Sequence, residues 1–162
     1  MVMSQQFERM KKIPFEFRFT TKPYNAKKQE FYAAQIAGFT TSKAFKAVEV
    51  GMHVNDVEFL ADGTGMATDT TGYYSQFYLN VPAHHYVFYD PKSSERTNLL
   101  ETHKKHVKVS FPITHINDNG MVYPLDQYPG KLVYFVIFMD YNLNKIIDNG
   151  ELRKLEVEFY KR

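Results

Sequence analysis

Short runs in which large apolar residues alternate with polar ones constrain the fold of this chain more than any other feature. Successive side chains of a β-strand point to opposite faces, so each run predicts a strand with one buried and one solvated face. The apolar positions are Ile13, Phe15, Phe17 and Phe19 in one run, Val107, Val109, Phe111 and Ile113 in a second, and Leu155, Val157 and Phe159 in a third. We therefore expect three strands at these places.

Residues 131–140 are apolar on both faces, which predicts a buried, central strand. Short runs between residues 66 and 89 are separated by turn residues, as in a β-sandwich. The 14 Phe and 12 Tyr residues supply large side chains that favour strands. About seven to nine strands, mostly with close neighbours, predict an all-β fold: a two-layer antiparallel β-sandwich, Ig-like or prealbumin-like, with one or two short helices.

The remaining segments are less regular. Residues 25–37 suit either a strand or a short helix that starts at Asn25, and we assign the helix. A second short helix is expected at 95–105, and two short strands at 48–60. Residues 117–120 read Asn-Asp-Asn-Gly, which predicts a tight turn.

Length and charge favour one domain, 1–162, and argue against nucleic acid as a partner. A chain of 162 residues is the usual size for a single core. Its net charge of +2 comes from interspersed charges of both signs, which create no large basic field for phosphates. The lysine pairs at 11–12, 27–28 and 104–105 are interpreted as separate solvated faces.

The cysteine count and the apolar runs limit other classes of site. With no cysteine, the chain has no disulfides, thiolate zinc sites or cysteine nucleophiles. Its longest apolar run, 132–139, is too short to span a bilayer, so membrane insertion is not expected. The first ten residues lack an apolar core of signal-peptide length, which leaves secretion open. An extracellular or cell-envelope location is expected.

The most specific chemical feature is the segment 140–151, which places oxygen side chains at positions 1, 3, 5, 9 and 12. These residues are Asp140, Asn142, Asn144, Asp148 and Glu151, and Ile146 at position 7 would add its main-chain carbonyl. Calcium prefers six to eight oxygen ligands, and alternate residues of a curling loop can point toward one ion. The segment predicts a structural calcium site. The alternative is a simple hairpin turn at 148–150 with solvated polar neighbours.

This segment resembles an EF-hand or dockerin calcium loop. It departs from that pattern at position 6, where Lys145 replaces the glycine of the sharp turn, and it follows a strand rather than a helix. It is also similar to loops in β-sandwich domains of bacterial surface proteins, in which a strand runs directly into Asp-x-Asn-x-Asn-x-x-x-Asp-x-Gly-Glu. That resemblance implies an ion that stiffens a hairpin or an edge loop.

A second segment, 68–87, resembles the core of prealbumin-like domains, including the carboxypeptidase regulatory-like family. It reads Thr-Asp-Thr-Thr-Gly-Tyr, then a strand, then Pro-Ala-His-His-Tyr-Val. His84 stands where that family usually has glycine. The resemblance implies a seven-stranded sandwich that serves as a binding or spacer module without catalytic residues.

The histidines and the possible catalytic motifs give weaker evidence for a site. The six histidines are His53, His84, His85, His103, His106 and His115. His103 and His106 would share a face of a helix, but no carboxylate completes a metal motif, so ordinary exposed or hydrogen-bonded histidines are favoured. The chain has no nucleophile elbow, no phosphate-binding loop and no distinctive carboxylate pair, so we expect no catalytic residues.

Together these features predict a non-enzymatic binding or adhesion module of a bacterial surface or envelope system, stabilised by calcium. Its partner would be a protein or another copy of the chain. The alternative is a self-assembling structural subunit of a capsid, a fibre or a secretion machine. Carbohydrate binding is a third function, since tyrosine rings can stack on sugars, although the chain has no tryptophan.

Overall fold

The computed structural model describes residues 4–57, 60, 76–80, 86–92 and 97–161. The strands are β1 (Ser4–Lys11), β2 (Phe15–Thr21), β3 (Ala34–Phe39), β4 (Gln76–Leu79), β5 (Tyr86–Val87), β6 (Asn98–His103), β7 (His106–Ile113), β8 (His115–Asp118), β9 (Met121–Pro124), β10 (Leu132–Met139) and β11 (Leu152–Tyr160). The helix α1 spans Ser42–Ala47, and two 3-10 helices, η1 and η2, span Val54–Asp56 and Leu125–Gln127.

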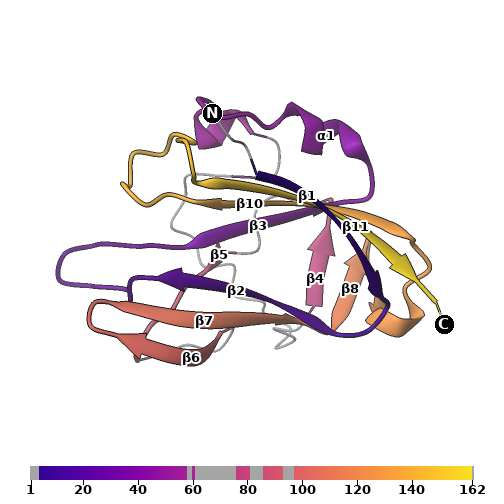
Figure 1. Cartoon of the computed structure of the whole chain (residues 1–162), viewed down its shortest axis with the longest axis horizontal. Coiled ribbons are helices and arrows are strands. Elements are labelled where there is room, and N and C mark those ends of the chain that lie inside the picture. Colours follow the sequence, from indigo (N-terminus) through magenta and orange to yellow (C-terminus); the bar gives the residue numbers. More distant parts are fainter. Residues whose placement is uncertain (1–3, 58–59, 61–75, 81–85, 93–96, 162) are drawn as a thin grey trace.

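These strands form two packed sheets, which confirms the predicted all-β sandwich (Figure 1). The larger sheet has the order β1-β11-β10-β3-β4-β8-β9, with β5 also paired to β3, and the smaller sheet has the order β2-β7-β6. The larger sheet is mixed rather than wholly antiparallel, because β1–β11, β3–β4 and β4–β8 are parallel pairs. Parallel pairing needs a long connection, and each of these pairs is separated by a long stretch of chain.

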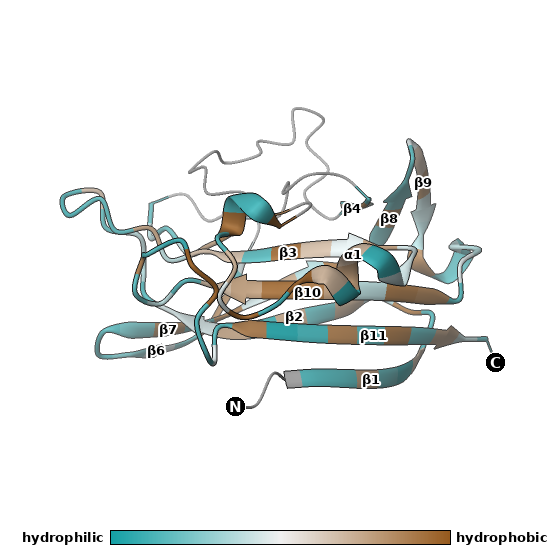
Figure 2. Ribbon diagram, turned by 90° about the horizontal axis from the view of Figure 1, so that it is seen from above, coloured by the Kyte–Doolittle hydropathy of each residue, from teal (hydrophilic) through white to brown (hydrophobic). Residues whose placement is uncertain are grey.

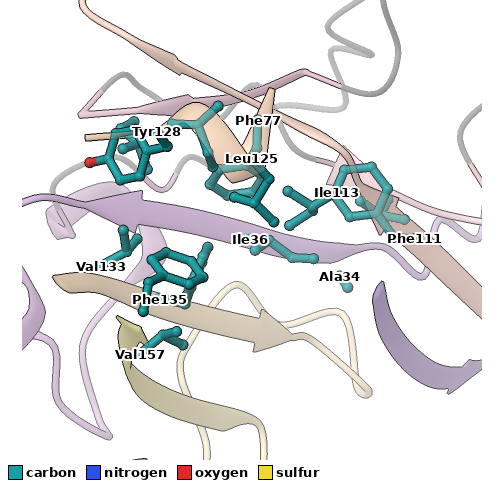
Figure 3. Close-up of a cluster of buried hydrophobic side chains, with 14 of the residues drawn as sticks. Ala34, Ile36, Phe77, Phe111, Ile113, Leu125, Tyr128, Val133, Phe135 and Val157 are labelled. Atoms are coloured by element: carbon teal, nitrogen blue, oxygen red, sulfur yellow. The ribbon is translucent and has the colours of Figure 1, made fainter. Parts of the chain in front are cut away.

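The space between the two sheets holds the first core (Figure 3). Phe135 of β10 is fully buried there and makes edge-on ring contacts with Phe17 of β2 at 5.3 Å and with Phe77 of β4 at 5.4 Å between centroids. The predicted inward residues of β7, Val107, Val109, Phe111 and Ile113, are all buried. Phe15, Phe17 and Phe19 of β2 pack against this core while their polar neighbours are exposed, as the period of two predicts.

A second core covers the outer face of the larger sheet. Phe138 and Val136 of β10 point to this side and pack with Phe45 of α1 and with Ile147. Figure 1 shows α1 on the side of the large sheet away from β2, β7 and β6. Both faces of β10 are thus buried, which confirms its predicted central place, and Figure 2 shows this strand as hydrophobic along much of its length between β3 and β11.

Lys154 of β11 extends its charged group into this second core and is only 3% exposed. Its Nζ donates a hydrogen bond to the Val48 carbonyl oxygen at 3.3 Å and lies 4.6 Å from the centroid of the Phe45 ring. Burial lowers the pKa of Lys154, and Glu49 partly opposes this shift. The hydrogen bond and the ring offset part of the desolvation of the ammonium group.

The predicted secondary structure of three segments is wrong. Residues 25–37 contain no helix, because Asn25 caps only a turn, accepting hydrogen bonds from the N–H groups of Lys27 and Lys28, and the chain then enters β3. The expected helix at 95–105 is replaced, in its described part, by β6 and a turn. In place of two strands at 48–60 the described residues form a turn at Gly51, a single bridge at His53 and η1.

The predicted turn at 117–120 is confirmed. Asp118 pairs with Met121 across the β8–β9 hairpin, and Asn119 and Gly120 form a two-residue connection with φ angles of 52° and 89°. Two positive φ angles in succession suit Asn-Gly. Of the prealbumin-like segment, residues 68–75 and 81–85 lie outside the described residues, whereas β4 and β5 are strands as expected.

In the part of the chain that the structure describes, no helix has the length and apolar character needed to cross a membrane.

Gly38 of β3 permits the close approach of β4. A Cβ atom at this position would lie 2.5 Å from Cε1 of Phe77 and 3.0 Å from Cδ2 of Leu79. We therefore expect Gly38→Ala to lower the free energy of unfolding by about 1–3 kcal/mol, because the buried ring must move. Urea denaturation would measure this, and Phe77→Leu in the Gly38→Ala background should restore part of the loss. Equal stability of Gly38→Ala and the parent chain would contradict this packing.

Candidate metal centre

The candidate loop, residues 140–151, joins β10 to β11, the two longest strands in the interior of the larger sheet. Asp140 follows β10 directly and Glu151 precedes β11 directly, and the last paired residues below the loop are Phe138 and Leu152. The N–H of Met139 also donates to the Glu151 carbonyl oxygen at 3.0 Å. The first and last predicted ligands are thus held by neighbouring strands of the sheet, whose spacing is fixed by the ladder.

The middle of the loop is attached to the segment that contains η1. The Ile147 side chain is fully buried in the second core, and its backbone N–H and carbonyl bond Met52 and Gly51 at 2.9 and 2.7 Å. The carbonyl oxygen of Lys145 accepts from the N–H of Val54 at 2.9 Å, which completes an isolated bridge between His53 and Ile146. The loop is therefore anchored at both ends and at its centre. The sequence pattern did not predict that residues 51–54 contact the loop. These residues form only single backbone bridges with it, and such bridges leave no alternation of apolar residues.

Asp140 organises the first half of the loop. Its Oδ1 accepts from the N–H of Asn144 at 3.1 Å, and its Oδ2 accepts from the N–H of Lys145 at 2.7 Å. Lys145 has a φ of 64°, in the left-handed region. The sharp turn that glycine makes at position 6 of an EF-hand is thus present here with a lysine, although a Cβ atom disfavours this conformation.

Asp148 accepts hydrogen bonds from the side chains of both asparagines of the loop. Its Oδ2 accepts from Nδ2 of Asn142 at 2.8 Å and from Nδ2 of Asn144 at 2.7 Å. The hydrogen bond from Asn142, followed by that from Asn144, lowers the pKa of the Asp148 carboxyl group. The amide oxygens are used as well, because Oδ1 of Asn142 and Oδ1 of Asn144 accept from the backbone N–H groups of Asn144 and Ile146.

Glu151 lies at the base of the loop and is only 6% exposed. Its Oε1 accepts from the N–H of Tyr141 at 2.8 Å, and its Oε2 accepts from the N–H of Asp148 at 3.0 Å. Both oxygens of this buried carboxylate are thus occupied by backbone donors. Glu151 therefore ties the start of the loop to its end.

The five oxygen-bearing side chains thus belong to one network, with Ile146 at its edge. Side-chain hydrogen bonds link Asn142 and Asn144 to Asp148, whereas Asp140 and Glu151 join the network through backbone N–H groups. Within the described residues, no three His, Asp or Glu side chains are close enough together to hold a metal ion by themselves. The chemistry of the donors fits a hard cation, since all are oxygens, but the two asparagines turn their amide NH2 groups toward Asp148.

These two NH2 groups lie beside Oδ2 of Asp148, at the position that a bound cation would take. Rotation of the terminal amides of Asn142 and Asn144 by 180° would direct both oxygens toward Asp148. None of the ion pairs formed between described residues includes Asp140, Asp148 or Glu151. A bound cation could take the place of the amide donors at Asp148.

The histidines do not form a second centre among the described residues. His103 and His106 face each other as a pair across the β6–β7 hairpin rather than along a helix. Nε2 of His103 lies 2.8 Å from Oε2 of Glu101, and Nδ1 of His53 accepts from the N–H of Asn55 at 3.1 Å. His84 and His85 lie outside the described residues.

The conformation of Lys145 gives a direct test of the loop geometry. Lys145→Gly should raise the free energy of unfolding by roughly 0.5–1 kcal/mol in metal-free buffer, because glycine adopts a positive φ without a Cβ clash. Lys145→Ala removes the same charge but keeps the Cβ atom, so it should not give this gain. Urea denaturation of the three proteins measures the difference. An equal gain for Lys145→Ala and Lys145→Gly would show that the charge, not the backbone, is responsible.

No family model, curated protein or solved structure matches this chain.

Proposed function

We propose that this chain is a non-enzymatic β-sandwich binding module of a bacterial surface or envelope system, stabilised by a structural calcium ion in the loop 140–151. The observation that carries this proposal is the hydrogen-bonded loop that holds the oxygen-bearing side chains at positions 1, 3, 5, 9 and 12, three of them carboxylates, in one network. Six to eight oxygens within about 2.4 Å are the surroundings that calcium prefers.

The ligand set would come from both ends of the loop. Asp140, Asn142, Asn144 and Asp148 would supply side-chain oxygens, Ile146 its main-chain oxygen, and Glu151 one or two carboxylate oxygens. Because the asparagines are neutral, the protein would supply three negative charges, partly offset by Lys145. An affinity in the range of extracellular calcium modules, with Kd of roughly 10⁻⁴–10⁻³ M, fits such a site.

The proposed ion has a structural role because of where the loop lies. It connects the central strands β10 and β11, and Ile147 fixes its centre in the second core. A cation would tie the end of one strand to the start of the next and oppose fraying of the sheet at this end. Stability, rather than a change of shape, is the expected consequence.

Calcium should therefore raise the melting temperature of chelator-treated protein. At a calcium concentration about 100 times Kd, binding to the folded state alone stabilises it by roughly 2–3 kcal/mol. Asp140→Asn and Asp148→Asn should each abolish the shift, because each removes a charged ligand.

Asp126→Asn, which changes a carboxylate in η2 outside the loop, is the matched control and should keep the full shift. Magnesium should have less effect, because it keeps its waters and demands octahedral geometry. An unchanged melting temperature of the parent chain with calcium would contradict the proposal.

A second function, self-assembly as a structural subunit, is favoured by the edge strands. Both β6 and β9 form an end of their sheet, and each exposes two adjacent apolar residues. Leu99 and Leu100 of β6 are 45% and 41% exposed, and Met121 and Val122 of β9 are 60% and 44% exposed. Edge strands of this kind offer unpaired backbone groups and apolar area to another chain.

Light scattering of the purified chain, with calcium and with a chelator, would test self-assembly. A subunit of this kind should form a large assembly in both buffers, and Leu99→Lys together with Met121→Lys should dissociate it, because charged edges oppose strand addition. A monomer in both buffers at high protein concentration would contradict this second function.

A further inference from the structure

We propose that a basic groove between residues 22–30 and the β6–β7 turn binds an acidic oligosaccharide. The groove has a volume of about 430 Å³ and is lined by Lys22, Lys28, Lys104 and Lys105. These lysines belong to two chain segments that are far apart in sequence. Lys28, Lys104 and Lys105 come from the lysine pairs 27–28 and 104–105, which are interpreted from the sequence alone as separate solvated faces. The site shares no residue with the calcium loop, so it goes beyond the proposed function and does not depend on it.

The charge of the groove is concentrated and largely uncompensated. Four lysines face one carboxylate, that of Glu30, which gives a net charge of +3. Among the described residues none of the four ammonium groups forms an ion pair. All four lysines are exposed, and Nζ of Lys22 also donates a hydrogen bond to the Tyr32 hydroxyl oxygen at 3.5 Å. A concave surface lined by one sign of charge attracts anions.

One wall of the groove is held rigidly. Asn25 and Glu30 exchange two backbone hydrogen bonds of 3.2 Å, and Oδ1 of Asn25 accepts from the N–H groups of Lys27 and Lys28 at 3.1 and 3.2 Å. Nζ of Lys22 lies 4.7 Å from the centroid of the Tyr32 ring. These contacts fix the positions from which Lys22 and Lys28 reach into the groove, which reduces the ordering cost of binding.

The other wall is a hairpin turn with an unfavourable sequence. His103 pairs with His106, so Lys104 and Lys105 form the whole connection, and Lys104 has a φ of 20°. The β8–β9 hairpin of the same protein has a connection of the same length and uses Asn119 and Gly120. Two adjacent lysines repel each other and lack the backbone freedom that such turns favour. A local sequence that opposes its own turn is typical of a functional position.

The remaining lining residues indicate a sugar rather than a bare anion. Tyr24 offers an aromatic ring, while Thr102 and Asn25 offer a hydroxyl group and amide N–H donors beside the lysines. Such groups can contact the ring face and hydroxyls of a saccharide, and the lysines can contact its sulfate or carboxylate groups. Lysine is a point charge without the planar fork of arginine, so it suits anionic groups in varied orientations.

Binding of a heparin-derived hexasaccharide, measured by isothermal titration calorimetry in chelator-containing buffer, tests the proposal. We expect binding that weakens as ionic strength rises from about 0.01 M to about 0.15 M, since the screening length falls from about 30 Å to about 8 Å. Neutral maltohexaose should not bind, and polyphosphate of similar charge should bind more weakly. Equal binding of polyphosphate would show that the groove recognises charge alone and would overturn the assignment to a saccharide.

The Lys104→Gly/Lys105→Asn variant separates binding from folding. Gly-Asn suits a two-residue turn with a positive φ at its first position, so the melting temperature should be unchanged or higher, while hexasaccharide binding should weaken on the order of tenfold. The Lys22→Gln/Lys28→Gln variant should weaken binding similarly from the other wall. Lys43→Gln/Lys46→Gln removes the same charge from α1 and should bind like the parent chain. Retained binding in both groove variants, or an equal loss in the α1 variant, would overturn the proposal.

Discussion

The two-sided burial of β10 is the constraint on which the rest of this structure depends. Its odd-numbered residues, such as Phe135, fill the space between the sheets, and its even-numbered residues, such as Phe138, fill the space beneath α1. A strand apolar on both faces cannot lie at an edge, so it needs hydrogen-bonded neighbours on each side and cover above and below. β3 and β11 supply the first requirement, and the small sheet and α1 supply the second.

The candidate calcium loop follows from that central position. Asp140 begins where β10 leaves the core and Glu151 ends where β11 enters it, so the sheet itself fixes the two ends of the loop. Buried Ile147 fixes the middle. Within this frame, Asp140, Asp148 and Glu151 accept hydrogen bonds from the loop's own backbone and amide groups. A loop held in this way would suit the proposed structural ion rather than a signalling EF-hand, in which flanking helices move.

The sequence predicts strands well where one face is buried and poorly elsewhere. β2, β7 and β11 alternate and were predicted, whereas β3 is buried at every residue and β6 is exposed at every residue, so neither shows a period. The parallel pairing of β1 with β11 joins the two ends of the chain, about which a local pattern contains no information. In the loop, residue spacing predicted the ligands of a calcium ion, which stays a prediction, and the structure places the five oxygen-bearing side chains in one hydrogen-bonded loop. The spacing did not predict the positive φ of Lys145 or the bridge to His53.

The central claim is that the loop 140–151 is built around a place for a calcium ion, and backbone NMR during a calcium titration tests it most directly. The N–H groups of Asn144, Lys145 and Asp148 bond the carboxylates and amides that would turn toward the ion. Their resonances, together with the side-chain NH2 signals of Asn142 and Asn144, should shift and saturate at millimolar calcium, while those of β2, β6 and β7 stay unchanged. Loop resonances that do not respond to calcium, or shifts spread evenly over the acidic surface, would contradict the claim.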